Sequence, residues 1–185
     1  MPIGAYAEKQ IMPEDKLVSV PDGVSSEVAS CITLKGITAE YLLHRAYPLK
    51  KGDKILYHAA AGALGQILCP WANAIGAEVI GTVGSKEKEE IAKKNGCHHV
   101  INYTDKNFVE EVEKIVGKNG IDVVYDGVGA KTFEGSIEVL KIRGMMVAFG
   151  NASGYVDTID VKKHINAKGL FFTRPSIAHY TVKRE

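Results

Sequence analysis

Residues 58–66 read HAAAGALGQ and contain three small residues, Ala60, Gly62 and Gly65, with the spacing of a GxGxxG motif that has alanine in its first place. Between a strand and a helix, Gly62 would let the backbone approach a pyrophosphate, and Gly65 would let the helix pack tightly on the strand. The first turn of that helix would offer free N–H groups to phosphates. The alternative is close helix–strand packing with no ligand. The apolar run before the motif and the helical pattern after it favour dinucleotide binding.

The end of the next apolar run indicates which dinucleotide would bind. Recognition of an adenosine 2′-hydroxyl needs an Asp or Glu there, but residues 82–86 read TVGSK and the first carboxylate is Glu87. Gly84, Ser85 and Lys88 instead offer hydrogen bonds and a positive charge that suit a 2′-phosphate. We therefore expect NADP(H) rather than NAD(H). The alternative is a solvated, charged helix face, since KEKEEIAKK is rich in both signs.

The elements that must position these residues alternate regularly from Lys54 onward. The near-continuous apolar segments predict six strands buried on both faces: KILYHAA, AEVIGTV, HHVINY, IDVVYDGVG, GMMVAFG and GLFFT. Helical segments separate them, for example SKEKEEIAKKNG with Ser85 as N-cap. This alternation predicts an α/β fold with a doubly wound parallel sheet of Rossmann type. Before it, residues 16–20 (KLVSV) predict an edge strand, and Gly36 is expected to divide residues 25–47 into two helical pieces.

Composition excludes several classes of protein. The formal net charge of the 185 residues is +1, which gives no electrostatic support for binding nucleic acid. The N-terminus lacks an apolar signal core, and polar residues interrupt the apolar stretch 55–81, so no membrane span is expected. Three widely spaced cysteines without a CxxC motif argue against a disulfide framework and favour a reducing, cytoplasmic compartment.

The order of several motifs resembles one family closely. The segments that carry the resemblance are residues 50–88, VINY, VVYDGVG, VAFGNASG and FFTRPS. Together they are similar to the zinc-free quinone oxidoreductases, the zeta-crystallin type, of the medium-chain dehydrogenase/reductase superfamily. The resemblance covers nearly all of the chain. It implies a six-stranded Rossmann domain and an enzyme that reduces quinones with NADPH.

The resemblance also implies cofactor contacts at individual positions. Ala63 and Leu64 would donate backbone N–H groups to the pyrophosphate, Thr38 would lie near the nicotinamide carboxamide, and Tyr103 beside the adenosine phosphate. The segment that flanks the nicotinamide ribose and the turn after the last strand would contribute Phe149, Gly150, Asn151, Ser153, Phe172 and Arg174. The alternatives are that Tyr103 and Phe149 are core aromatics and that Asn151 and Ser153 are turn residues.

No catalytic residue or metal site is assigned. Where zinc-dependent relatives carry a cysteine ligand, this chain has Lys35, and Cys31 lies one helical turn away without a partner. Adjacent strand residues such as His98 and His99 point to opposite faces, which suits structural roles. Asp126, at the end of the fourth strand, could contact a ribose or substrate, or could equally cap the following DGVG turn.

The resemblance further predicts domain organisation and partners. Full-length members are about twice as long, so residues 1–24 are expected to be the remnant of an N-terminal GroES-like catalytic domain and residues 25–185 the NADP-binding domain. The apolar edge strand Gly169–Thr173 is expected to pair with a second copy in a homodimer. Two alternatives to a quinone reductase remain: an NADPH-dependent reductase of C=C bonds in enones or enoyl thioesters, and a non-catalytic NADPH-binding or dimerisation module.

Overall fold

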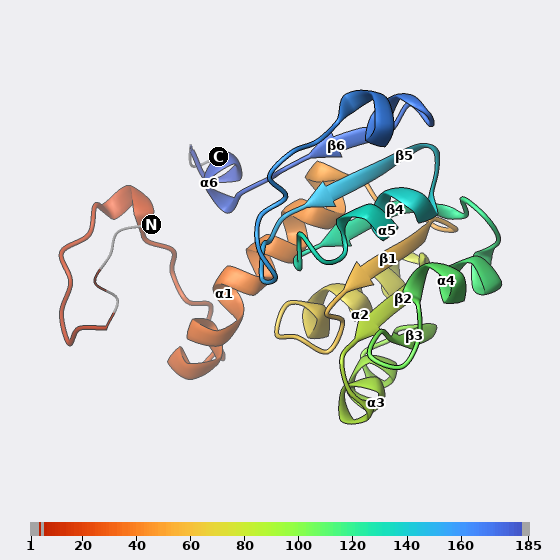
Figure 1. Cartoon of the computed structure of the whole chain (residues 1–185). Helices are drawn as coiled ribbons and strands as arrows, with labels where there is room; N and C mark the ends of the chain where they lie inside the picture. Colours follow the sequence, from red (N-terminus) through yellow and green to blue (C-terminus); the bar gives the residue numbers. More distant parts are fainter. Residues whose placement is uncertain (1–3, 5, 183–185) are drawn as a thin grey trace.

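All six predicted strands are present in the computed structural model, which describes residue 4 and residues 6–182. They are β1 (Lys54–His58), β2 (Glu78–Val83), β3 (His99–Asn102), β4 (Ile121–Asp126), β5 (Leu140–Ala148) and β6 (Phe171–Thr173). Every neighbouring pair is parallel, and the order across the sheet is β3-β2-β1-β4-β5-β6 (Figure 1). The strand order reverses between β1 and β4, which is the topology of a doubly wound sheet. The predicted fold is confirmed.

Helical segments precede, separate and follow the strands, and most of them cover the two faces of the sheet. They are η1 (Glu14–Lys16), α1 (Ser26–Glu40), η2 (Tyr41–Ala46), α2 (Gly65–Ile75), α3 (Lys86–Lys94), α4 (Phe108–Val116), α5 (Phe133–Val139), η3 (Val161–Asn166) and α6 (Ile177–Tyr180).

The core has two layers because side chains alternate along each strand. Ile55 and Tyr57 of β1 pack with α1, η2, α2 and α3 on one face of the sheet. Leu56, between them, packs with α4 and α5 on the other face. Both faces are therefore apolar, as the near-continuous hydrophobic strands predicted.

Two expectations for the N-terminal region were wrong. Residues 16–20 form no strand, and Leu17, Val18 and Val20 are exposed. Residues 6–24 loop out beside the sheet instead of lying along an edge of it (Figure 1). Gly36 does not divide the following helix, because α1 continues through it. Ser25 caps this helix by accepting a hydrogen bond from the amide of Val28 at 3.3 Å.

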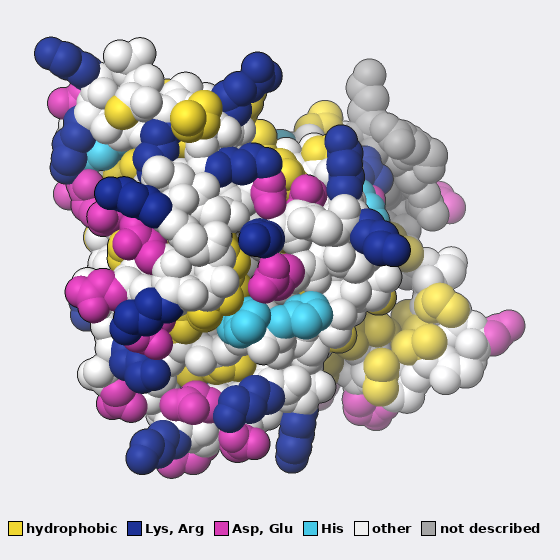
Figure 2. Space-filling model, turned by 90° about the vertical axis from the view of Figure 1, so that its right-hand side faces the viewer, with side chains coloured by type: hydrophobic (Ala, Val, Ile, Leu, Met, Phe, Trp, Pro, Cys, Tyr) yellow, Lys and Arg dark blue, Asp and Glu magenta, His cyan; other side chains and the backbone are white. Residues whose placement is uncertain are grey.

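The surface carries mixed charge. In Figure 2 the basic and acidic side chains are interspersed over the face shown, without a continuous area of one sign. This distribution matches the formal net charge of +1. Among the described helices, none has the length and apolar character required to cross a membrane.

Candidate functional site

The loop between β1 and α2 is shaped by close backbone approaches. A Cβ atom on Gly65 would lie only 2.3 Å from the carbonyl oxygen of Ala60, so no other residue fits there without movement. Ala60 is held in turn by a 2.9 Å bond from its amide to the carbonyl of Thr82 in β2. Ala59 adopts a positive φ of 62°, which turns the chain sharply after the strand. The GxGxxG-like spacing thus has the packing role predicted for its last glycine.

The same loop offers unused hydrogen-bond donors. Within the described part of the chain, the amides of Ala63, Leu64 and Gly65 donate no hydrogen bond, and no side chain caps the start of α2. Gly62 differs, because its amide already donates to the carbonyl of Ala59 at 2.9 Å. Three free N–H groups at the N-terminus of an eleven-residue helix fit the phosphates of a dinucleotide.

The residues predicted to recognise a 2′-phosphate lie together beyond β2. A Cβ on Gly84 would meet the hydroxyl oxygen of Tyr103 at 2.7 Å, so the tyrosine lies directly over this glycine. Ser85 begins α3, and its hydroxyl accepts the amide of Lys88 at 3.4 Å. Tyr103 is 47% exposed and is therefore not a core aromatic. The structure brings the four residues together, and their role stays a prediction.

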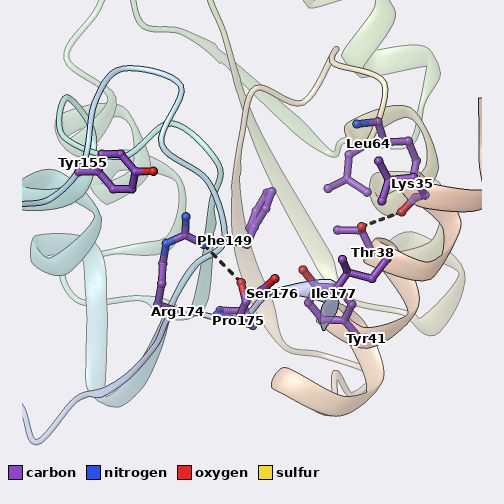
Figure 3. A pocket seen from close by; sticks show the side chains of 11 residues that line it. Lys35, Thr38, Tyr41, Leu64, Phe149, Tyr155, Arg174, Pro175, Ser176 and Ile177 are labelled. Atoms are coloured by element: carbon purple, nitrogen blue, oxygen red, sulfur yellow. Dashed lines mark hydrogen bonds between the residues drawn. The ribbon is translucent and has the colours of Figure 1, made fainter. Parts of the chain in front are cut away.

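A cleft of about 600 Å³ lies beside the loop, between α1 and the segment that follows β6 (Figure 3). Four of the predicted contact residues line it: Thr38, Leu64, Phe149 and Arg174. Sequence reasoning gave no contact role to the other residues of its lining: Leu34, Lys35, Tyr41, Tyr155, Pro175, Ser176 and Ile177. A signal was present for the residues of α1 and the start of η2, because positions 34, 35, 38 and 41 recur with helical spacing on one face.

Tyr41 closes one end of this cleft. Its ring stacks on that of Tyr180 in α6, with centroids 4.4 Å apart and an interplanar angle of 9°. Burial raises the pKa of Tyr41, so its phenol stays protonated at neutral pH and keeps its O–H donor. The stacked pair ties α6 to η2, which directly follows α1.

The segment after β5 is built on tight contacts with the β4–α5 loop. A Cβ on Gly150 would lie 2.4 Å from the carbonyl oxygen of Gly127. Asn151 lies against Gly129, where an added Cβ would meet the Cα of Asn151 at 3.1 Å. The hydroxyl of Ser153 donates to the carbonyl of Val128 at 2.9 Å. Ser153 therefore braces this turn, and its contact with the cofactor stays a prediction.

Phe172 was predicted to flank the cofactor, but it does not line the cleft. Its side chain packs in the opposite layer of the core, edge-to-face with Phe133 at a centroid distance of 6.3 Å. The reason is the register of β6, in which Phe172 pairs with Met146 of β5. The side chain of Met146 belongs to the core layer with α4 and α5, whereas the cleft opens beside the layer with α1 and α2.

Asp126 caps the turn that follows β4. Its fully buried carboxylate accepts hydrogen bonds from the amides of Val128 and Gly129 at 2.7 and 2.9 Å. The hydroxyls of Thr132 and Ser136 donate to its other oxygen at 2.7 and 3.3 Å. The contacts favour the capping alternative, because four protein donors already satisfy this carboxylate.

A buried polar chain connects Asp126 to His58, the residue before the loop. The ring of His58 lies 2.9 Å from the hydroxyl of Thr82 through Nδ1 and 2.9 Å from the hydroxyl of Ser136 through Nε2. Because Ser136 donates to Asp126, Nε2–H donates to Ser136 and Nδ1 accepts from Thr82. Sequence reasoning missed this chain, since its members come from β1, β2, β4 and α5.

The buried His58 predicts a pH dependence of stability. Burial lowers the pKa of His58 from its ordinary value of 6.5, against the opposing charge of Asp126. Below pH 6.5 the unfolded chain therefore takes up a proton at this histidine that the folded chain does not. This uptake favours the unfolded state, so the stability of the fold decreases as the pH falls from 6.5 toward the folded pKa. We expect the free energy of unfolding to fall by up to about 1.4 kcal/mol per pH unit in this window, relative to His58→Gln. Urea unfolding at several pH values measures it, and a pH-independent difference between the two proteins would contradict it.

No metal centre is formed by the described residues. Among residue 4 and residues 6–182, no three His, Cys, Asp or Glu side chains gather closely enough to hold an ion. His98 accepts the amide of Val79 at 3.0 Å, and His99 contacts Glu78 at 3.1 Å. Both contacts agree with structural roles for the two histidines. Independence from zinc stays a prediction.

The strand order and the glycine-rich loop after β1 define a Rossmann-type α/β domain. The chain belongs to the zinc-binding dehydrogenase family, whose model matches residues 63–184. It is 46% identical over 186 residues to a 2-haloacrylate reductase of Burkholderia sp, covering 99% of this chain and 56% of the relative. It is 44% identical over 184 residues to quinone oxidoreductase 1 of Escherichia coli strain K12, covering 99% of this chain and 56% of the relative.

The crystal structure of Escherichia coli quinone oxidoreductase complexed with NADPH is also similar, with a TM-score of 0.87 and 44% identity. The match covers 91% of this chain and 52% of the crystallised chain. The predicted resemblance to quinone oxidoreductases is confirmed. The chain spans about half the length of the curated relatives that it matches.

Proposed function

We propose that this chain is the cofactor-binding part of an NADPH-dependent quinone oxidoreductase. The observation that carries the proposal is the loop before α2, whose last three amides donate no hydrogen bond within the described residues. Gly65 lets the start of this helix pack against the carbonyl of Ala60, where a larger residue would not fit. The similar quinone oxidoreductase, 44% identical, was crystallised with NADPH. When bound, NADPH supplies the hydride that reduces the quinone.

Within this proposal each group of residues has a separate task. The amides of Ala63 and Leu64 bind the pyrophosphate, and Thr38 with Phe149 lies near the nicotinamide at the cleft. The 2′-phosphate is bound by the group beyond β2: Gly84, Ser85, Lys88 and Tyr103. The protein orients the cofactor and excludes water. This role requires no nucleophilic side chain.

The proposal extends to organisation and setting. Residues 1–24 would belong to a catalytic domain, and residues 25–185 to the cofactor domain. The enzyme would be a cytoplasmic homodimer, joined through residues 169–173. The position of β6 at the edge of the sheet and the 49% exposure of Phe171 support this pairing.

Replacing Lys88 by methionine tests the cofactor assignment. Lys88 is exposed and forms no ion pair within the described residues, so its charge is available to a phosphate. We expect Lys88→Met to weaken NADPH binding about tenfold while leaving NADH binding unchanged, because only NADPH carries the 2′-phosphate. Fluorescence titration of the chain with both coenzymes measures the effect. Lys94→Met, at the exposed end of the same helix, is the control and should change neither affinity. Equal affinity of the unaltered chain for NADPH and NADH would contradict the assignment.

A second candidate function is reduction of an activated C=C bond. The observation that favours it is the 46% identity to a 2-haloacrylate reductase over 99% of this chain. The two functions are separated by measuring NADPH oxidation from its absorbance, once with 1,4-benzoquinone and once with 2-chloroacrylate as the substrate. Faster turnover of the acrylate would favour this second function. Binding of NADPH without turnover of either compound by the full-length protein would favour the non-catalytic module.

A further inference from the structure

Lys35 occupies a position in the cleft that the assigned contacts leave without a role. It lies on α1 one turn before Thr38 and is partly buried. Its side chain lines the cleft together with Leu64, from the loop before α2. Figure 3 shows the two side chains next to each other on one wall of the cleft, with Arg174 and Tyr155 on the opposite wall.

The charge of Lys35 has no protein partner in the part of the chain that the structure describes. No ion pair or hydrogen bond involves its amine, whereas Arg174 donates to the carbonyl of Pro175 at 3.3 Å. The cleft lining contains no Asp or Glu. An ammonium group that lines a cleft without a carboxylate is available to form charge-assisted hydrogen bonds with an anionic ligand. The site is therefore suited to an anion.

We propose that Lys35 binds the pyrophosphate of the dinucleotide together with the free amides of Ala63 and Leu64, beside which it lies. This inference rests on the proposed function. The loop amides supply directional hydrogen bonds, and an ammonium group on a flexible stem adds the compact charge that phosphate oxygens favour. The position of Lys35 beside Leu64 favours the pyrophosphate over the anionic group of a substrate, which would have the guanidinium of Arg174 available on the opposite wall.

The two coenzymes provide a test, because they share the pyrophosphate and differ in the 2′-phosphate. We expect Lys35→Met to weaken binding of NADPH and of NADH by the same factor, about tenfold, in fluorescence titrations of the chain. Lys88→Met should weaken NADPH alone. Lys35→Arg, which keeps the charge, should recover most of the affinity for both. Methionine preserves the apolar stem of lysine, so the melting temperature should stay unchanged and show that the variant folds.

Three outcomes would overturn the inference. If Lys35→Met leaves both affinities unchanged while the unaltered chain binds NADPH, Lys35 is not a phosphate ligand and the proposed function stands. If Lys35→Met raises only the KM for 2-chloroacrylate, the lysine serves the substrate. If the folded, unaltered chain binds neither coenzyme, the proposed function fails and the inference fails with it.

Discussion

Gly65→Ala is expected to destabilise the domain by about 3 kcal/mol and to abolish most of its coenzyme binding. The added Cβ would lie 2.3 Å from the carbonyl oxygen of Ala60 and 2.7 Å from its carbonyl carbon. Both are backbone atoms, so no side-chain rotation relieves the clash and α2 must move away from β1. For a domain of this size the midpoint of thermal unfolding should fall by about 6–12 °C, measured by circular dichroism.

Gly36→Ala is the matched control for this substitution. Gly36 lies within α1, and an added Cβ would meet no atom within 4 Å. Alanine is the better helix former by about 0.5–1 kcal/mol, so this variant should be as stable as the unaltered chain or slightly more stable. If Gly65→Ala melted at the same temperature as Gly36→Ala, the close packing of α2 on β1 would be refuted.

Asp126→Ala is expected to cost about 4 kcal/mol of unfolding free energy. The substitution removes a fully buried carboxylate and leaves the amides of Val128 and Gly129 without an acceptor. The hydroxyls of Thr132 and Ser136 lose a partner as well. Asp126→Asn keeps one acceptor oxygen for the amides, so its cost should be about half as large. Urea unfolding of the three proteins measures the series.

Asp157→Ala provides the control for the loss of a carboxylate. Asp157 is exposed in the loop after β5, and its replacement should change stability by less than about 0.5 kcal/mol. A small effect of Asp126→Ala, comparable with that of Asp157→Ala, would show that the four hydrogen bonds do not stabilise the turn. In that case a ligand-binding role for Asp126 would again be open.

The strands were predictable because each is a short apolar run bounded by glycines or polar residues, as in residues 54–58 and 121–126. Such a run forms a strand in a parallel sheet that helices cover on both faces, although the edge strand β6 stays partly exposed. The alternating pattern of residues 16–20 was misleading for the opposite reason. A strand buried on one face forms only where a neighbouring edge is free to pair with it, and sequence does not reveal that edge.

The candidate site was predictable where local spacing alone determines it. Gly65 and the loop amides depend on a single turn between β1 and α2, so the motif was enough. The role of Asp126 depends on Thr132 and Ser136, which the fold brings to it from α5. The role of Lys35 likewise depends on the packing of α1 beside the loop. Contacts between distant elements have no signature in one sequence.

The reversal of strand order at the centre of the sheet also determines when the domain can be completed during synthesis. Ile55 of β1 pairs with Val79 on one side and with Val123 on the other. The three strands β1, β2 and β3 can therefore pair as soon as they leave the ribosome. The second edge of β1 pairs only after β4 has been synthesised. Until then a central strand, with the apolar residues Ile55, Leu56 and Tyr57, has an open edge, and nascent chains are vulnerable there to pairing with one another.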